Sequence, residues 1–118
     1  MTKYPKATMM KLNAWVMIVC WGALVLWGLF TFLTWLSFAV DTYAEILFYL
    51  FIVTVGIHVV LATVLTCPNC GKRPTIQIFT IHKKSEKLWG MDGWAVVIIR
   101  SAFYGRFRCI HCATDYQL

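Results

Sequence analysis

The chain has 118 residues, of which 60% are hydrophobic and only 14% are charged, and its formal net charge is +6. Soluble domains average about 25% charged residues, so this composition, with a mean hydropathy of +0.69, excludes an ordinary small soluble domain. Aromatic residues make up 16% of the chain, which suits a protein whose Trp and Tyr side chains gather at membrane–water interfaces.

Two apolar segments without charged residues account for this composition. They cover residues 12–40 and 46–66, and the short acidic stretch Asp41–Glu45 lies between them. About 20 apolar residues in a helix cross the ~30 Å hydrocarbon core of a bilayer, so we expect two transmembrane helices that form an antiparallel hairpin. The first segment is too long for a cleaved signal peptide, whose apolar region covers about 7–15 residues.

The basic residues predict the orientation of this hairpin. All 11 Lys and Arg residues lie before the first apolar segment or after the second, and none lies between the two. Cytoplasmic flanks of membrane helices carry an excess of Lys and Arg. We therefore expect both termini in the cytoplasm, and we expect the membrane to be the cytoplasmic (inner) membrane of a bacterium.

Two Cys-x-x-Cys motifs follow the second apolar segment, at residues 67–70 and 109–112. Such a pair can present thiolates to one tetrahedral ion at about 2.3 Å, and the pair is far more specific than either motif alone. A disulfide framework does not suit a reducing cytoplasm. A thioredoxin-like redox site would need one such motif in a βαβ pattern, which the sequence lacks.

The tail resembles a zinc ribbon built from two rubredoxin-type knuckles, over residues 67–118. Ala113 stands where the second knuckle usually has Gly, and the 38 residues between the motifs exceed the usual spacing of about 15–20. The resemblance implies one structural zinc ion, with iron, as in true rubredoxins, as the alternative metal. The implied ligands are Cys67, Cys70, Cys109 and Cys112.

The predicted fold is therefore a membrane α-helical hairpin of two transmembrane helices, followed by a small α+β or β zinc-ribbon domain. Its parts are a cytoplasmic N-terminal segment 1–11, the hairpin 12–66 and the cytoplasmic domain 67–118. Between the motifs, alternation predicts strands at Thr75–Ile81 and Phe103–Arg108. The run from Asp92 to Gly105 favours a short helix, with a strand as the alternative because of its β-branched residues.

One ionisable residue lies inside the second apolar segment. His58 shares a helix face with Thr54 at a spacing of four. If the hairpin turns at Asp41–Glu45, His58 lies level with Gly28 of the first helix. We interpret these three residues as polar packing between the helices, and Cys20 as an inert buried thiol.

The segment between the motifs contains aromatic residues that are flanked by Lys and Arg. Aromatic rings flanked by Lys and Arg suit a headgroup region or a partner protein at that depth. We expect part of this set in the domain core and part at a membrane or partner interface. The candidate interface residues are Trp89, Trp94, Lys83, Lys84 and Arg100.

The sequence shows no nucleophile–base pair, paired carboxylates or phosphate loop, and four Cys ligands leave no open metal position for catalysis. We therefore expect a non-enzymatic accessory subunit, or an assembly or stabilising factor, of a larger membrane protein complex. The expected partners are the lipid bilayer and integral membrane subunits. The alternatives are a membrane-tethered, rubredoxin-like electron carrier and a membrane tether for a polyanionic partner; we do not expect nucleic acid.

Overall fold

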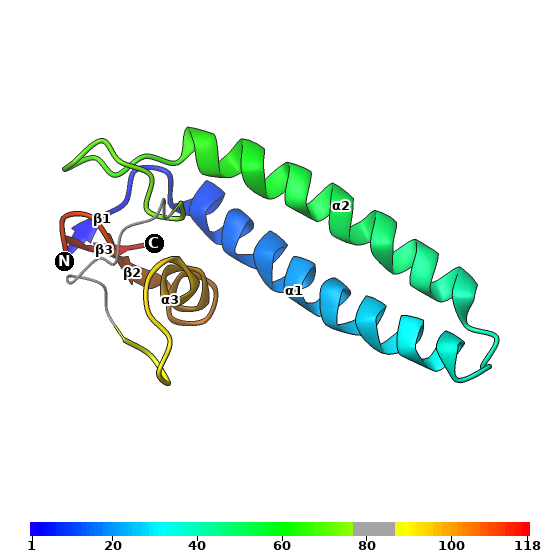
Figure 1. Ribbon diagram of the computed structural model, residues 1–118. Helices are drawn as coiled ribbons and strands as arrows, with labels where there is room; N and C mark the ends of the chain where they lie inside the picture. Colours follow the sequence, from blue (N-terminus) through cyan, green and yellow to red (C-terminus); the bar gives the residue numbers. More distant parts are fainter. Residues whose placement is uncertain (77–86) are drawn as a thin grey trace.

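The computed structural model describes residues 1–76 and 87–118 (Figure 1). The predicted strand Thr75–Ile81 falls largely outside these residues, as do Lys83 and Lys84. The elements, in chain order, are β1 (Thr2–Lys3), α1 (Ala7–Trp35), α2 (Asp41–Val64), α3 (Trp94–Ile99), the π-helix η1 (Arg100–Tyr104), β2 (Arg106–Arg108) and β3 (Asp115–Gln117).

The two long helices form an antiparallel hairpin that projects from a small domain (Figure 1). Both are long and apolar enough, by length and composition, to cross a membrane. In the most apolar 18-residue stretch of each helix, only 17% of α1 and 11% of α2 is buried inside the protein. Apolar side chains that the chain does not bury against itself need another apolar environment. Most of the hairpin surface is therefore available to such an environment.

The turn of the hairpin lies at residues 36–40, and its predicted position at Asp41–Glu45 is wrong. Ser37 takes a left-handed conformation with φ of 72° and helps to reverse the chain. Asp41 instead lies in the first turn of α2, where the positive end of the helix dipole favours a carboxylate. The acidic residues thus mark a helix start rather than a loop.

A small sheet brings the two ends of the chain together. Its order is β1-β3-β2, in which β1 runs parallel to β3 and β2 antiparallel to it. Thr2 pairs with Tyr116, and Tyr116 pairs with Phe107. The N-terminal segment, predicted as a separate part, therefore belongs to the same folded unit as the cysteine-containing tail.

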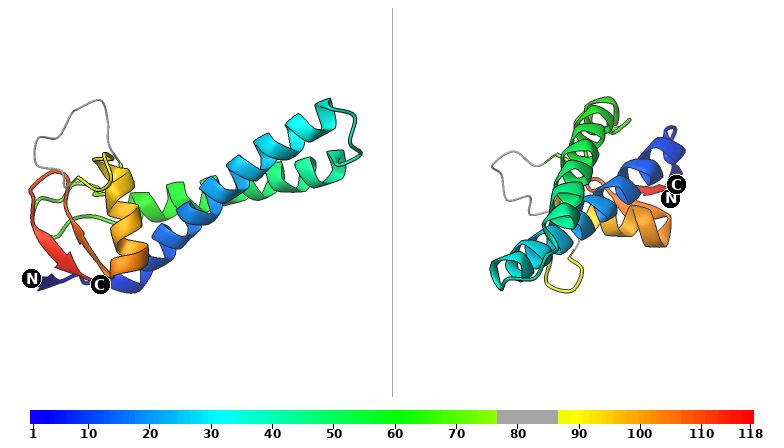
Figure 2. Two further views of the ribbon diagram at one scale, coloured as in Figure 1. Left: turned by 90° about the horizontal axis from the view of Figure 1, so that it is seen from below. Right: turned by 90° about the vertical axis from the view of Figure 1, so that its right-hand side faces the viewer.

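The helix predicted in the run after Asp92 is confirmed as α3 and η1, which lie across the base of the hairpin (Figure 2). Gly93, with φ of 72°, directly precedes the helix, which therefore begins two residues after Asp92, and Gly105, with φ of 62°, ends it. β2 begins at Arg106 and not at Phe103, because η1 continues the helix through Tyr104. All four residues of the run 96–99 are buried, which accounts for its lack of polar residues.

Two buried clusters join the domain to the hairpin. In the smaller cluster, Ile98 of α3 packs with Ala14, Met17 and Cys20 of α1. The larger cluster joins the N-terminal segment, the base of the hairpin and the tail, and it comprises Tyr4, Met10, Leu65, Cys67, Val97, Phe107, Cys109, Ile110 and Tyr116. Because each cluster draws on both parts, the domain is fixed to the hairpin and does not hang from a linker.

Candidate metal centre

The four predicted ligands converge on one point, since the sulfur atoms of Cys67, Cys70, Cys109 and Cys112 all lie within 4.8 Å of one another. The Sγ atoms of Cys67 and Cys112 are 3.6 Å apart, and those of Cys70 and Cys109 are 3.8 Å apart. Four sulfurs around a tetrahedral ion at about 2.3 Å are separated by ~3.8 Å. The cluster therefore has the dimensions of a four-thiolate metal site.

The two motifs fold into matching turns. The Gly71 amide donates to the Cys67 carbonyl oxygen at 2.8 Å, and the Ala113 amide donates to the Cys109 carbonyl oxygen at 2.9 Å. In the same way, the amides of Cys67 and Cys109 donate to the carbonyl oxygens five residues later, at 2.8 and 2.9 Å. Each motif thus closes on itself locally, and tertiary packing has only to bring the two turns face to face.

The residue after the second Cys of each motif has a left-handed backbone. Gly71 has φ of 69° and Ala113 has φ of 60°. An L-residue pays a steric cost of about 1–2 kcal/mol in this conformation, and Gly does not. The second turn therefore keeps the geometry of the first despite its unusual Ala, with strain that the surrounding contacts hold in place.

The cysteines differ in burial, and two of their sulfur atoms lie beside hydroxyl groups. Cys67 and Cys109 are buried, whereas Cys70 and Cys112 are half-buried. The Tyr116 hydroxyl lies 3.2 Å from the Cys67 sulfur, and the Thr114 hydroxyl lies 3.3 Å from the Cys112 sulfur. These contacts orient the sulfurs, as outer hydrogen bonds do around metal ligands.

Burial disfavours charge on part of this set. Burial raises the pKa of the Cys109 and Cys70 thiols above its usual range. Burial also acts to raise the pKa of Cys112, but hydrogen bonds from Thr114 and neighbouring thiols lower it to about 6. Cys70 and Cys109 thus need a nearby cation to become thiolates readily, and a set of four sulfur donors suits a soft or borderline divalent metal.

His58 contacts a different residue from the one predicted. Its Nδ1–H donates to the Asn13 side-chain oxygen at 2.8 Å, and Asn13 is completely buried. Gly28 is exposed, and a Cβ atom built there meets nothing within 4 Å, so its predicted position beside His58 is wrong. The error follows from the turn, which lies before Asp41 and shifts the register of the two helices.

Thr54 and Cys20 are both buried, as predicted. Thr54 is buried, and its hydroxyl donates to carbonyl oxygens of its own helix at 2.9 Å. Cys20 is 3% exposed and packs in the cluster around Ile98. Asn13 is the polar partner of His58 that was not predicted. The signal for it in the sequence is a single amide side chain inside the apolar segment 12–40.

The candidate interface residues separate into two groups. Trp89 is 77% exposed, whereas Trp94 is half-buried and its ring lies 5.8 Å from that of Trp21 in α1. Arg100 is half-buried on η1, with its guanidinium 5.6 Å from the ring centre of Tyr104. Trp94 thus joins the domain to the hairpin, and Trp89 faces outward.

Comparison with protein-family models, curated proteins and solved structures finds no match to this chain. Its function is therefore inferred from its own residues and their geometry.

Proposed function

We propose that the chain is an integral membrane protein whose hairpin spans the bilayer and whose tail holds one structural zinc ion. We infer that it acts as a non-enzymatic accessory subunit or assembly factor of a larger membrane complex. The observation that carries this proposal is a four-sulfur cluster built directly onto the base of an apolar hairpin.

The sulfur cluster supports zinc in a structural role. Cys67 and Cys109 would hold it from inside the core, and Cys70 and Cys112 from the rim. A bound Zn²⁺ would supply charge neutralisation and a rigid cross-link between the two turns, and four protein ligands leave no coordination position for a substrate. The metal would therefore hold the domain in shape beneath the hairpin.

The surface of the hairpin supports insertion in a bilayer. Its exposed apolar side chains extend along both helices, while Lys6 and Lys11 lie at the end beside the domain. The Lys6 ammonium donates to the Val64 carbonyl oxygen at 2.9 Å, at the end of α2. Both termini lie at this basic end of the hairpin, and the positive-inside bias assigns it to the cytoplasm, which we propose is bacterial.

The proposed role as a subunit is supported by one face of α2. A shallow apolar groove of about 420 Å³ is lined by Val53, Gly56, Ile57, Val60 and Leu61. Small residues allow the backbones of transmembrane helices to approach closely. A Cβ atom at Gly56 would meet nothing within 4 Å in this chain, so the space above it is open to a helix of a partner subunit.

Iron is the second candidate because Cys70 and Cys112 are only half-buried. Exposed sulfurs let a partner approach an iron–thiolate centre, as electron transfer requires, and iron accepts the same ligand set. Elemental analysis and the visible spectrum of the purified protein separate the two metals. One zinc per chain and no visible absorption support the proposal, whereas stoichiometric iron with visible absorption supports the electron carrier.

Membrane insertion and partnership are tested on the full chain. An impermeant thiol reagent applied from outside the cell should label Thr42→Cys and should not label Lys72→Cys; the reverse pattern would contradict the orientation. In mild detergent, Gly56→Leu should lose co-purifying membrane subunits, and Gly28→Leu should keep them. Gly28 is a matched control because a Cβ atom there also meets nothing within 4 Å. Equal co-purification by both variants would reject the α2 groove as the contact.

A further inference from the structure

The helix formed by α3 and η1 packs across one short stretch of α1, at the base of the hairpin (Figure 2). At its start, the ring of Trp94 lies 5.8 Å from the ring of Trp21. Near its end, the ring of Phe103 lies 5.4 Å from the ring of Trp15, in an edge-to-face contact. Ile98 lies between them along the helix and is completely buried. The helix therefore meets α1 between Trp15 and Trp21.

These contacts fix the distance of the helix from the outer end of the hairpin. α1 ends at Trp35, which lies 14 residues after Trp21 and 20 residues after Trp15. At a rise of about 1.5 Å per residue, the two stretches are ~21 Å and ~30 Å long. The hydrocarbon core of a bilayer is ~30 Å thick, so the part of α1 beyond Trp21 is too short to cross it alone. A hairpin that spans the bilayer must therefore place α3 and η1 at the inner boundary of that core.

The surface of the protein at this level is aromatic. Phe103 and Tyr104 are 61% and 51% exposed, and the neighbouring Trp15 of α1 is 47% exposed. Because the rings of Phe103 and Trp15 are in contact, the exposed surface of η1 continues the exposed apolar surface of α1. Trp and Tyr side chains gather at the boundary between hydrocarbon and headgroups. The aromatic surface thus lies at the depth at which the length of α1 places that boundary.

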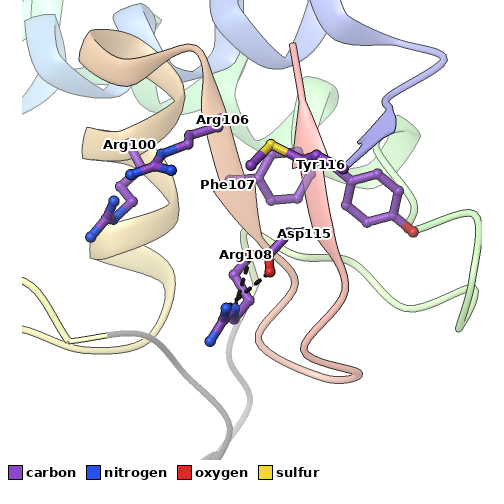
Figure 3. A pocket seen from close by; sticks show the side chains of 7 residues that line it. Arg100, Arg106, Phe107, Arg108, Asp115 and Tyr116 are labelled. Atoms are coloured by element: carbon purple, nitrogen blue, oxygen red, sulfur yellow. Dashed lines mark hydrogen bonds and ion pairs between the residues drawn. The ribbon is translucent and has the colours of Figure 1, made fainter.

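The charged side chains of this region lie beside the sheet. No charged residue occurs from Gly93 to Ile99. Arg100 lines a small cavity together with residues of β2 and β3 (Figure 3), and its guanidinium lies 5.6 Å from the ring centre of Tyr104. The other charged residues that line this cavity are Arg106, Arg108 and Asp115. Tyr104 therefore lies where the aromatic surface meets the charged one, which is the arrangement of a helix at a membrane surface.

We propose that α3 and η1 form an interfacial helix along the inner boundary of the hydrocarbon core, with Trp15, Phe103 and Tyr104 in contact with lipid. This inference rests on the proposed membrane insertion of the hairpin. It adds a third element that contacts the membrane and enters the inner leaflet without crossing it. Val97 of the same helix belongs to the buried cluster that contains two of the four cysteines, so the metal centre is held at a fixed height beside the membrane.

Site-specific photo-cross-linking tests this position in the full-length, metal-loaded protein, in vesicles of phosphatidylethanolamine and phosphatidylglycerol. The probe variant is Phe103→benzoylphenylalanine, and mass spectrometry identifies the adduct that forms on illumination. Val25→benzoylphenylalanine reports the insertion of the hairpin itself, because Val25 is 71% exposed and lies within α1. Lys72→benzoylphenylalanine is the control at an exposed residue beyond the end of α2.

The Phe103 and Val25 variants should both give lipid adducts, and the Lys72 variant should give none. Val25 lies ten residues, or ~15 Å, before the end of α1, so it should react near the methyl ends of the acyl chains, whereas Phe103 should react near their carbonyl ends. Lipid adducts at Val25 but none at Phe103, or equal yields at Phe103 and Lys72, would overturn this inference and keep the insertion of the hairpin. The absence of lipid adducts at both Val25 and Phe103 would reject the insertion, and the inference with it.

Illumination of the Phe103 variant in native membranes separates lipid from a partner protein. A protein adduct in place of a lipid adduct would assign this surface to a partner subunit and overturn the proposal. The metal content of each variant reports whether the domain is folded. Should the Phe103 variant lose its metal, Tyr104→benzoylphenylalanine replaces it, since Tyr104 is also exposed, and the same outcomes then decide the inference.

Discussion

The Tyr4 hydroxyl donates a hydrogen bond to the Thr66 carbonyl oxygen at 2.9 Å, across 62 positions of the sequence. Thr66 immediately precedes the ligand Cys67, and the Tyr4 ring packs edge-on against Phe107 and Tyr116, at 5.3 and 5.5 Å. The segment before α1 thus forms a wall of the domain that contains the cysteine cluster. Its burial raises the pKa of Tyr4 to about 12, so the side chain is neutral at physiological pH.

Replacing Tyr4 should therefore destabilise the cysteine domain. Tyr4→Ala should lower its unfolding free energy by about 3–5 kcal/mol, as for other buried aromatic residues. Tyr4→Phe loses only one hydrogen bond and should cost about 1 kcal/mol. Thermal unfolding followed by metal release measures both effects. A Tyr4→Ala protein as stable as the natural one would show that the N-terminal segment is not part of the domain.

Because Gly71 and Ala113 both have a left-handed backbone, substitutions at these two positions should change the stability of the domain in opposite directions. Gly71→Ala should destabilise the domain by about 1 kcal/mol, and the cost should come from the backbone alone because a Cβ atom there meets nothing within 4 Å. Ala113→Gly should stabilise it by up to about 1 kcal/mol, since relief of strain exceeds the added entropy of the unfolded chain. Melting temperatures check both, and a shift of the same sign in the two variants would contradict the matching geometry.

Loss of the metal should unfold the domain and leave the hairpin helical. Metal binding to four thiolates contributes on the order of 10 kcal/mol to small domains of this kind, so Cys109→Ser should abolish the domain's cooperative unfolding. Cys20→Ser is the control, because Cys20 lies in α1, outside the cysteine cluster. Circular dichroism and metal analysis separate the two variants, and an unchanged domain in Cys109→Ser would exclude a structural metal.

Acid should release the metal. Burial raises the pKa of Cys109 and Cys70, so protons compete with the metal for these sulfurs, and apparent affinity falls as the pH decreases. If the metal is the proposed zinc, the amount released to a chelating dye should rise steadily as the pH falls below neutrality, and the metal should return to the protein when the pH is restored. Affinity that is independent of pH would show that the ligands are not thiols.

The Asn13–His58 pair predicts a coupling between the two long helices. Asn13→Leu or His58→Leu alone leaves one buried polar group without its partner, while the double variant leaves neither. We expect a coupling energy of about 0.5–1.5 kcal/mol in a double-mutant cycle of thermal unfolding in detergent. The cycle of Asn13→Leu with Thr54→Val is the control, since Thr54 bonds to its own helix, and it should be additive.

The two tryptophans near α3 should respond differently to substitution. Trp94→Ala removes the contact with Trp21 and should cost about 3–5 kcal/mol. Trp89, at 77% exposure, should be replaceable by Ala without loss of metal, while the response of tryptophan fluorescence to lipid decreases. Unfolding of the Trp89→Ala protein would show that this side chain is part of the core.

The sequence by itself determined the local features of this protein. The two apolar segments, the cysteine ligand set and the short helix after Asp92 could be recognised because each depends on neighbouring residues. Helix length and composition, Cys-x-x-Cys spacing and helix-terminating glycine act within a few residues. The matching turns at Gly71 and Ala113 follow from the same local rules.

Only the tertiary structure decided which distant residues meet. A shift of the turn from Asp41–Glu45 to residues 36–40 changed the partner of His58 from Gly28 to Asn13, because register along a hairpin depends on every residue of its turn. The pairing of Thr2 with Tyr116 and the burial of Tyr4 show that the N-terminal segment is part of the cysteine-containing domain. Such contacts join residues that are 45 positions apart, as for Asn13 and His58, or 114 positions apart, as for Thr2 and Tyr116, and no local spacing in the sequence predicts them.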